Sequence, residues 1–422
     1  MSYVVQGKSG VELNRIYEED LSIHDWYRFV LSYPPHLVKD YLCRFGVGNK
    51  NCVLDPFCGT GTTLVECKKH GISSIGIEAN PVVHLIAQTK TRWDVDTASL
   101  VKHAAAIAEE AQARITKYAD NLITLTEEQE QVIIKDSISP IPLHKSLVLL
   151  EVLREFHDER FSNYEKTAFA KQVVFSFSNL KFGPEVGVSR KKKFDADVIE
   201  IWLAQVTVMA KNIEAFSRGY NAKAVVHLAD SRNIGKTLQP NSIDAVITSP
   251  PYPNEKDYSR TTRLESVLLG FMSSKKDLRA HKEQFLRSNT RNVYVNDTDE
   301  KWITQNSRIL ELADSIERKR IELGKDSGFE KLYHKVVRLY FGGMACHLEE
   351  LKPKLRPGAK LAYVVGDQAS YFRILIPTGE ILADIARHAG YEVVAIDLFR
   401  TRLATATKNL LREEVVILQW KG

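Results

Sequence analysis

A short segment after the apolar residues 245–247 carries the most specific chemistry in the chain, Ser249-Pro250-Pro251-Tyr252. Two consecutive prolines remove two backbone donors, so a strand that ends here leaves its carbonyl groups without ladder partners. The Ser249 hydroxyl and the Pro250 carbonyl can accept the hydrogens of a planar amine while Tyr252 stacks on the attached ring. This arrangement suits the exocyclic amino group of a nucleobase. Four residues alone are not specific, however, and taken in isolation the segment is more typical of a strand-ending turn with a packed tyrosine.

A glycine-containing turn closer to the N-terminus supplies a second candidate site. A short apolar run ends at Asp55, the turn contains Gly59 and Gly61, and an apolar-periodic segment follows. This order is typical of a nucleotide-binding strand–turn–helix unit, in which glycines let a ligand approach backbone N–H groups at a helix N-terminus. The turn lacks the Gly-Lys-Ser/Thr ending of a phosphate-binding P-loop, so it predicts a different ligand.

Both segments resemble motifs of one family, the S-adenosylmethionine-dependent amino-group DNA methyltransferases. Ser249–Tyr252 resembles their catalytic tetrapeptide; serine in its first position is usual in the cytosine-N4 branch, whereas adenine-N6 enzymes more often carry aspartate or asparagine. Residues 55–63 resemble their cofactor loop, Asp-Pro-Phe-x-Gly-Ser-Gly-Thr. The resemblance implies catalytic roles for Ser249, Pro250, Pro251 and Tyr252, and S-adenosylmethionine contacts from Asp55, Pro56, Phe57, Gly59, Thr60, Gly61, Thr62 and Thr63.

Two acidic residues end further predicted strands. Glu78 follows the run 74–77 and lies 17 residues beyond Gly61, close to the spacing at which a Rossmann-like site places a carboxylate on ribose hydroxyls. Asp230 ends a predicted strand at 224–229, and the resemblance implies that it receives the adenine amino group of the cofactor. Each acid has an alternative interpretation, a solvated strand end for Glu78 and a simple turn residue for Asp230.

One sheet must bring these residues together. In open α/β sheets, ligands bind beyond the carboxyl ends of the strands, and each of the four candidate sites follows a predicted strand. The sequence therefore predicts an α/β fold, and the resemblance implies a Rossmann-like class I methyltransferase sheet, mostly parallel with an antiparallel terminal strand. We expect five segments: the N-terminal helix and cofactor-binding half (1–90), a helical insertion (91–221), the catalytic-motif half (222–260), a second, helical and basic insertion (261–340) and the C-terminal strands and helices (341–422).

Clusters of cations supply candidate contacts to nucleic acid. A glycine-bearing loop at 181–193 ends in four of them, and two more lie on a loop between the predicted terminal strands. Such cations can contact phosphates, although a charge run is also typical of a solvated surface. The second insertion is a candidate for DNA recognition, with a helical lid as the alternative. The candidate phosphate contacts are Arg190, Lys191, Lys192, Lys193, Arg400 and Arg402.

Composition sets wider limits on the protein class. Hydrophobic residues make up 44% and charged residues 26% of the 422 residues, which is typical of globular proteins. No stretch reaches the apolar length of a membrane span, and residues 1–8 lack a signal-peptide pattern, so we expect a cytoplasmic protein. The five cysteines form no Cys-x-x-Cys pair, which argues against a zinc site or a disulfide framework. A net charge of +5 is compatible with a nucleic-acid partner.

These inferences lead to one expected activity, transfer of a methyl group from S-adenosylmethionine to the N4 amine of a flipped-out cytosine in double-stranded DNA. The resemblance implies a place in a restriction-modification or related defence system, which would supply a cognate restriction endonuclease as partner. The chain contains no Pro-Cys dipeptide, the nucleophile motif expected of cytosine-C5 enzymes. Adenine-N6 methylation, methylation of an RNA base and a non-catalytic nucleic-acid-binding module remain the alternatives.

Overall fold

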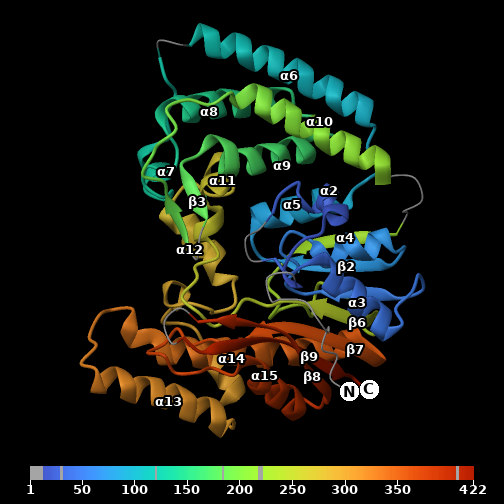
Figure 1. Cartoon of the computed structure of the whole chain (residues 1–422), viewed down its shortest axis with the longest axis vertical. Helices are drawn as coiled ribbons and strands as arrows, with labels where there is room; N and C mark the ends of the chain where they lie inside the picture. The colour runs from blue at the N-terminus through green and yellow to red at the C-terminus, as the bar shows by residue number, and fades with distance from the viewer. Residues whose placement is uncertain (1–12, 29–31, 119–120, 183–184, 217–221, 405–407) are drawn as a thin grey trace.

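The structure, a computed structural model, describes residues 13–28, 32–118, 121–182, 185–216, 222–404 and 408–422. It consists of a seven-stranded sheet covered by helices, with a block of further helices beyond one edge (Figure 1). Within these residues, no helix is long and apolar enough to cross a bilayer.

The sheet has the strand order β5-β2-β1-β6-β7-β9-β8. The first five strands in this order are parallel, and β9 lies antiparallel between β7 and β8. This confirms the predicted Rossmann-like sheet with an antiparallel terminal strand. Chain order reverses between β1 and β6, the switch point at which open α/β sheets bind ligands. The strands are β1 (Cys52–Asp55), β2 (Ser73–Glu78), β5 (Ala224–Leu228), β6 (Ile243–Thr248), β7 (Leu355–Gly366), β8 (Glu392–Leu403) and β9 (Leu410–Gln419).

Helices bury both faces of the central strands, as the nearly continuous apolar runs of parallel strands require. On one face, Leu54 of β1 packs in a core with α14 and α15. On the other face, the preceding residue, Val53, packs with α3 and α4. The sheet is therefore rigid where its strands end. The four helices are α3 (Pro35–Phe45), α4 (Thr62–Lys69), α14 (Tyr333–Leu351) and α15 (Thr378–His388).

The block of helices continues from α5 (Pro81–Thr91), which packs beside the edge strand β5 (Figure 1). Its core includes the fully buried Trp202 and Phe169. The short helix α11 (Arg263–Leu268) follows the Ser-Pro-Pro-Tyr segment in sequence, yet it joins this core through Leu264. The main helices of the block are α6 (Thr97–Lys117), α8 (Pro140–Glu155), α9 (Ser162–Gln172) and α10 (Val198–Phe216).

The proposed division of the chain into five segments stays a prediction. Helix α14 runs across the predicted boundary at 340–341.

The segment predicted as a loop at 181–193 contains a β-hairpin instead. Strands β3 (Leu180–Phe182) and β4 (Val186–Val188) pair in antiparallel register; Gly183 and Pro184 between them lie outside the described residues. The β-branched residues of β4 favour a strand, and the Ser189 N–H donates to the Asn179 carbonyl at 2.8 Å to close the base of the hairpin. The prediction of a loop over the whole of 181–193 was therefore wrong.

The predicted loop position of Arg400 and Arg402 was also wrong. Strand β8 continues through Leu403 and pairs with β9 as far as Leu410. The Arg400 Nε donates to Glu413 Oε2 at 2.5 Å across the two strands, so opposite charges stabilise the extended ribbon. Both arginines consequently project from β8, just after a register shift between Leu398 and Arg400.

Candidate active site

Ser249 is held at the carboxyl end of β6 with its hydroxyl oriented by the neighbouring strand. Its Oγ donates to the Val364 carbonyl of β7 at 3.1 Å. Because the only hydroxyl hydrogen is used in this bond, the lone pairs of Oγ remain available as acceptors. The preceding residue fixes the strand end, since Thr248 Oγ1 donates to Asp55 Oδ1 at 2.6 Å. The geometry therefore leaves Ser249 Oγ with free acceptor capacity.

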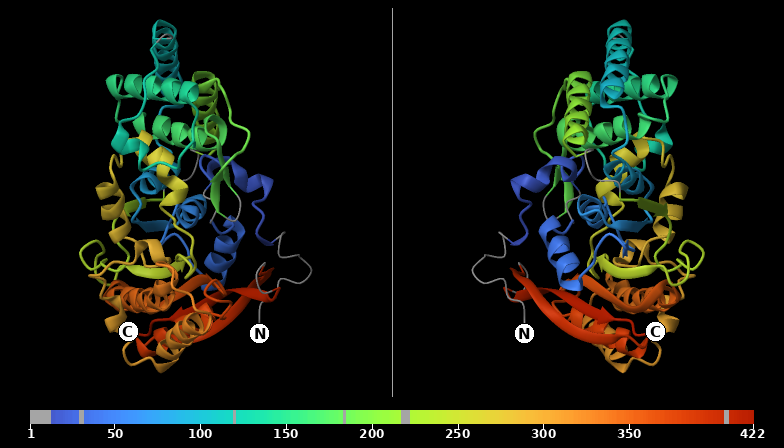
Figure 2. Two further views of the ribbon diagram at one scale, coloured as in Figure 1. Left: turned by 90° about the vertical axis from the view of Figure 1, so that its left-hand side faces the viewer. Right: turned by 90° about the vertical axis from the view of Figure 1, so that its right-hand side faces the viewer.

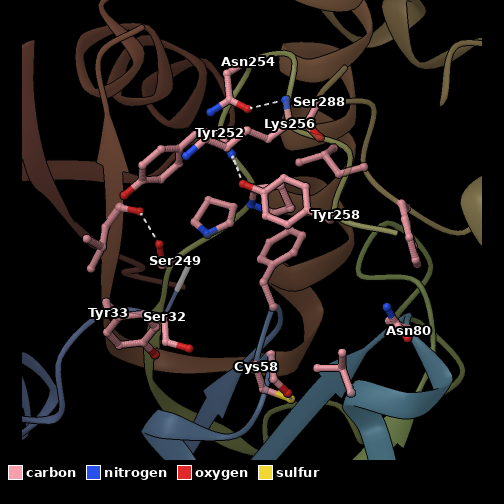
Figure 3. Close-up of a pocket in the computed structure, with 18 of the residues that line it drawn as sticks. Ser32, Tyr33, Cys58, Asn80, Ser249, Tyr252, Asn254, Lys256, Tyr258 and Ser288 are labelled. Carbon is pink, nitrogen blue, oxygen red and sulfur yellow. Dashed lines mark hydrogen bonds between the residues drawn. The ribbon is translucent and has the colours of Figure 1, made fainter. Parts of the chain in front are cut away.

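Tyr252 is positioned from two sides. Its backbone N–H donates to the Tyr258 Oη at 3.2 Å (Figure 3), and its ring lies so close to Gly366 that an added Cβ there would be 3.0 Å from Cε2. Burial raises the pKa of Tyr258 to about 12, so its hydroxyl stays protonated while it accepts this bond. The glycine and Tyr258 together set the orientation of the Tyr252 ring.

The glycine turn lies beside this segment because Asp55 connects the ends of β1 and β6. Asp55 is fully buried, and the Phe57 N–H donates to its Oδ1 at 3.1 Å. The turn reaches α4 through Gly61, whose φ of +87° is a conformation that favours glycine. Thr63 in the first turn of α4 donates to the Ile247 carbonyl at 3.1 Å.

A cavity of about 570 Å³ joins the two segments at the carboxyl ends of the strands. This volume lies within the roughly 300–1,000 Å³ typical of small-molecule sites. The predicted cofactor-contact residues Asp55, Gly61, Thr63 and Asp230 do not line it. The predicted residues that line it are Pro56, Phe57, Gly59, Thr60, Thr62, Glu78, Ser249, Pro250, Pro251, Tyr252, Arg400 and Arg402.

Two known proteins are similar to this chain over most of its length, and a third over a short part of it. A family model described as DNA methylase, for N6 and N4 methyltransferases, matches residues 10–89. The Type II methyltransferase M.BsoBI of Geobacillus stearothermophilus is 27% identical over 430 residues, which cover 92% of this chain and 82% of that protein. M.AvaI of a Nostoc species is 24% identical over 419 residues, with 91% and 82% covered. M.MjaII of Methanocaldococcus jannaschii is 42% identical over 80 residues, which cover 18% of this chain and 15% of that protein.

The chain is similar to amino-methylating DNA methyltransferases over most of its length, and residues 10–89 match the family model itself. This similarity supports S-adenosylmethionine as methyl donor and DNA as substrate. It does not distinguish cytosine N4 from adenine N6, because the same family includes both activities.

Glu78 fits the methyl donor. It ends β2 and lines the cavity, with its Oε1 accepting the Asn80 N–H at 2.8 Å. Burial raises the pKa of Glu78 to about 7, an effect that hydrogen bonds from the Asn80 and Gly59 backbone oppose. A buried carboxylate of this kind is stabilised by further hydroxyl donors, which the ribose of S-adenosylmethionine would supply.

The carboxylate of Asp230 is already paired within the protein. Arg232 donates from Nη2 to its Oδ2 at 2.7 Å and from Nη1 to Asp299 at 2.6 Å. The residues on either side, Ala229 and Ser231, line the cavity. A cofactor contact from Asp230 stays a prediction.

Several residues that line the cavity were not predicted. Tyr33, just before α3, lines the cavity (Figure 3). Its hydroxyl donates to Asp55 Oδ2 at 2.9 Å and contacts Thr63. The segment 284–292 folds back over the cavity, where Asn289 Nδ2 donates to the Lys256 carbonyl at 3.1 Å. No periodicity marks this segment, because its polar residues bond to parts of the chain that are distant in sequence.

We expect Tyr258→Phe to lower kcat of the methyltransferase about 2- to 12-fold, the effect of removing one neutral hydrogen bond. The ring remains, so the KM for S-adenosylmethionine should be unchanged. Steady-state rates with labelled cofactor measure both values. Tyr391→Phe is a matched control, since it removes a buried hydroxyl that donates to the Leu348 carbonyl at 2.8 Å, away from the cavity. Equal kcat values for Tyr258→Phe and the control would contradict the positioning role of Tyr258.

Proposed function

We propose that this methyltransferase transfers the methyl group of S-adenosylmethionine to the N4 amine of cytosine in duplex DNA, as part of a restriction-modification system. The observation that carries the proposal is the Ser249 hydroxyl, which donates to Val364 and faces the shared cavity as an acceptor. Serine at this position, rather than an acid or amide, supports cytosine over adenine. The Type II designation of the relatives supports the restriction-modification setting.

The chemical difficulty is the weak nucleophilicity of an aromatic amine, whose lone pair is delocalised into the ring. Ser249 Oγ and the Pro250 carbonyl accept the two amine hydrogens, which favours a tetrahedral nitrogen with its lone pair aligned for attack. S-adenosylmethionine supplies an electrophilic methyl group on a sulfonium. The new N–C bond forms as the C–S bond breaks, and one amine proton leaves to a base or to water.

The target base must leave the duplex to reach Ser249. Flipping costs a few kcal/mol, and stacking of the base on the Tyr252 ring offsets part of this cost, because base–aromatic stacking contributes about 1–3 kcal/mol. Asn254, Lys256 and Tyr258 line the cavity beside Tyr252 (Figure 3). Their polar groups are the candidates for contact with the edge of the flipped base.

The test is transfer of labelled methyl from S-adenosylmethionine to duplex DNA, followed by nucleoside analysis, with Tyr252→Ala compared with the unchanged protein. N4-methylcytosine that disappears in the variant supports the proposal. N6-methyladenine would retain the mechanism and overturn the cytosine assignment. Transfer to RNA alone would overturn the DNA assignment.

Cofactor affinity should depend on pH through Glu78. The free carboxyl has a pKa raised by burial to about 7, and ribose hydroxyls stabilise its charged form, so binding should lower this pKa and release a proton. Affinity for S-adenosylhomocysteine, the demethylated product, is therefore expected to rise about tenfold between about pH 6 and pH 8. Calorimetric titration measures it. Glu78→Gln should bind more weakly with a flat profile; the same slope in both proteins would exclude Glu78 as the ribose ligand.

A further inference from the structure

The loop after the β3–β4 hairpin presents an aromatic side chain to solvent. Phe194 has 80% of its surface exposed and follows Arg190, Lys191 and Lys192, which are exposed as well. A single exposed apolar residue needs no explanation. Here, however, the ring directly follows a run of four cations, residues 190–193. Hydrogen bonds also hold the residues on both sides of it.

Hydrogen bonds hold the backbone on either side of Phe194. The Lys193 N–H donates to Asn179 Oδ1 at 2.8 Å, and its ammonium group donates to the Ser176 carbonyl at 2.6 Å. On the other side, Asp195 Oδ1 accepts from Lys145 Nζ at 2.6 Å. The loop is therefore anchored at both neighbours, and its conformation keeps the Phe194 ring out of the core.

The β3–β4 hairpin connects the anchored loop to the methyl-transfer cavity. Asn179 bonds both to Lys193 and, through its carbonyl, to Ser189 at the base of the hairpin. Glu185, at the other end of β4, lines the cavity. At about 3.3 Å per residue, Glu185 and Ser189 are separated by about 13 Å, the length of about four base pairs. In Figure 1, β3 lies between α8 and α12 (Lys275–Glu283).

The charges of this loop are available to a partner. Within the described residues, Arg190, Lys191 and Lys192 form no ion pair with an acidic side chain, whereas Lys193 is used in carbonyl contacts. Exposed cations release counterions when they neutralise phosphates. An aromatic ring beside them can pack against a base stack from which one base has been removed.

We propose that residues 190–194 are a DNA-contact element, in which Arg190, Lys191 and Lys192 bind phosphates near the target base and Phe194 packs against the stack that the target leaves. This inference rests on the proposed function, because it requires a flipped base in duplex DNA. It assigns the ring a role that differs from Tyr252, which holds the base after it has left the stack.

The test compares Phe194→Ala and the double variant Lys191→Gln/Lys192→Gln with the unchanged protein. Binding to a fluorescein-labelled duplex of random sequence is measured over a range of salt concentrations with S-adenosylhomocysteine present, and methyl transfer is measured on plasmid DNA. Phe329→Ala is the matched control, because Phe329 is 54% exposed and lies beyond α13 (Ser307–Glu322).

We expect the double variant to reduce the salt slope of log affinity by about 1.8, the value for two phosphate contacts. Phe194→Ala should keep the slope and raise the KM for plasmid DNA about 5- to 160-fold, while Phe329→Ala changes neither. Unchanged slope and KM in the variants, with S-adenosylhomocysteine still bound, would overturn the inference. A product other than N4-methylcytosine would overturn only the proposed base, since DNA affinity is measured independently. An unchanged protein that bound no duplex would overturn both.

Discussion

Ser249→Ala is expected to lower kcat for methyl transfer roughly 100- to 1000-fold, the range seen when one preorganised hydrogen-bonding group is removed from a reacting centre. The Ser249 hydroxyl donates to the Val364 carbonyl at 3.1 Å and so can only accept from a substrate amine. Alanine removes that acceptor and leaves the Pro250 carbonyl alone to orient the nitrogen. The affinity for S-adenosylmethionine should stay the same, because the residues of the glycine turn are untouched.

Single-turnover rates with saturating cofactor separate this loss from weaker binding. Ser242→Ala is the matched control: Ser242 immediately precedes β6, at the end opposite to the cavity, and donates to the Gln239 carbonyl at 2.7 Å. The control should retain full activity. A rate for Ser249→Ala within about fivefold of the control would mean that the hydroxyl does not activate the amine, since one such acceptor contributes more than that.

Much of the site could be predicted because its elements are local in sequence. Ser249 and Glu78 each follow a short apolar strand, and the turn at Gly59 follows a third. The topology of parallel strands then places their carboxyl ends at one edge. The proximity of the two motifs could therefore be predicted without knowledge of tertiary contacts.

The contacts that orient these groups were not predictable in the same way. Tyr33 donates to Asp55, and Asn289 donates to the Lys256 carbonyl. The partners in each bond are distant in sequence, and no periodic pattern in the sequence predicts such contacts. Asp230 shows the opposite case, because Arg232 lies two residues beyond it and pairs with it at 2.7 Å. Because Asp230 and Arg232 are so close in sequence, their ion pair could have been predicted. Such a pair favours a structural role for Asp230 over a contact with the cofactor.

Asp55→Ala should cause a large loss of stability because this one side chain joins three elements. Its carboxylate accepts from Thr248 Oγ1 at 2.6 Å, from Tyr33 Oη at 2.9 Å and from the Phe57 N–H at 3.1 Å. Each buried donor left without an acceptor costs about 1–3 kcal/mol. Loss of the acceptor for the buried Thr248 hydroxyl should lower the free energy of unfolding by about 1–3 kcal/mol, and the part-buried donors of Tyr33 and Phe57 add to this loss. Cofactor affinity should fall with it, since the glycine turn would lose its anchor to β6.

Thermal unfolding and titration with S-adenosylhomocysteine measure the two effects. Asp94→Ala is the control, because Asp94 is 79% exposed in its pair with Arg92, and an exposed pair contributes at most about 1 kcal/mol. The unfolding temperature of Asp55→Asn should lie between those of Asp55→Ala and Asp94→Ala. The amide retains one acceptor oxygen, while its NH2 group faces a hydroxyl that must then reorient. If Asp55→Ala unfolded at the same temperature as Asp94→Ala, the carboxylate would not hold the ends of β1 and β6 together. If it were destabilised but bound the cofactor product normally, the turn would keep its shape without Asp55, and the backbone of Gly59 and Gly61 alone would account for the binding conformation.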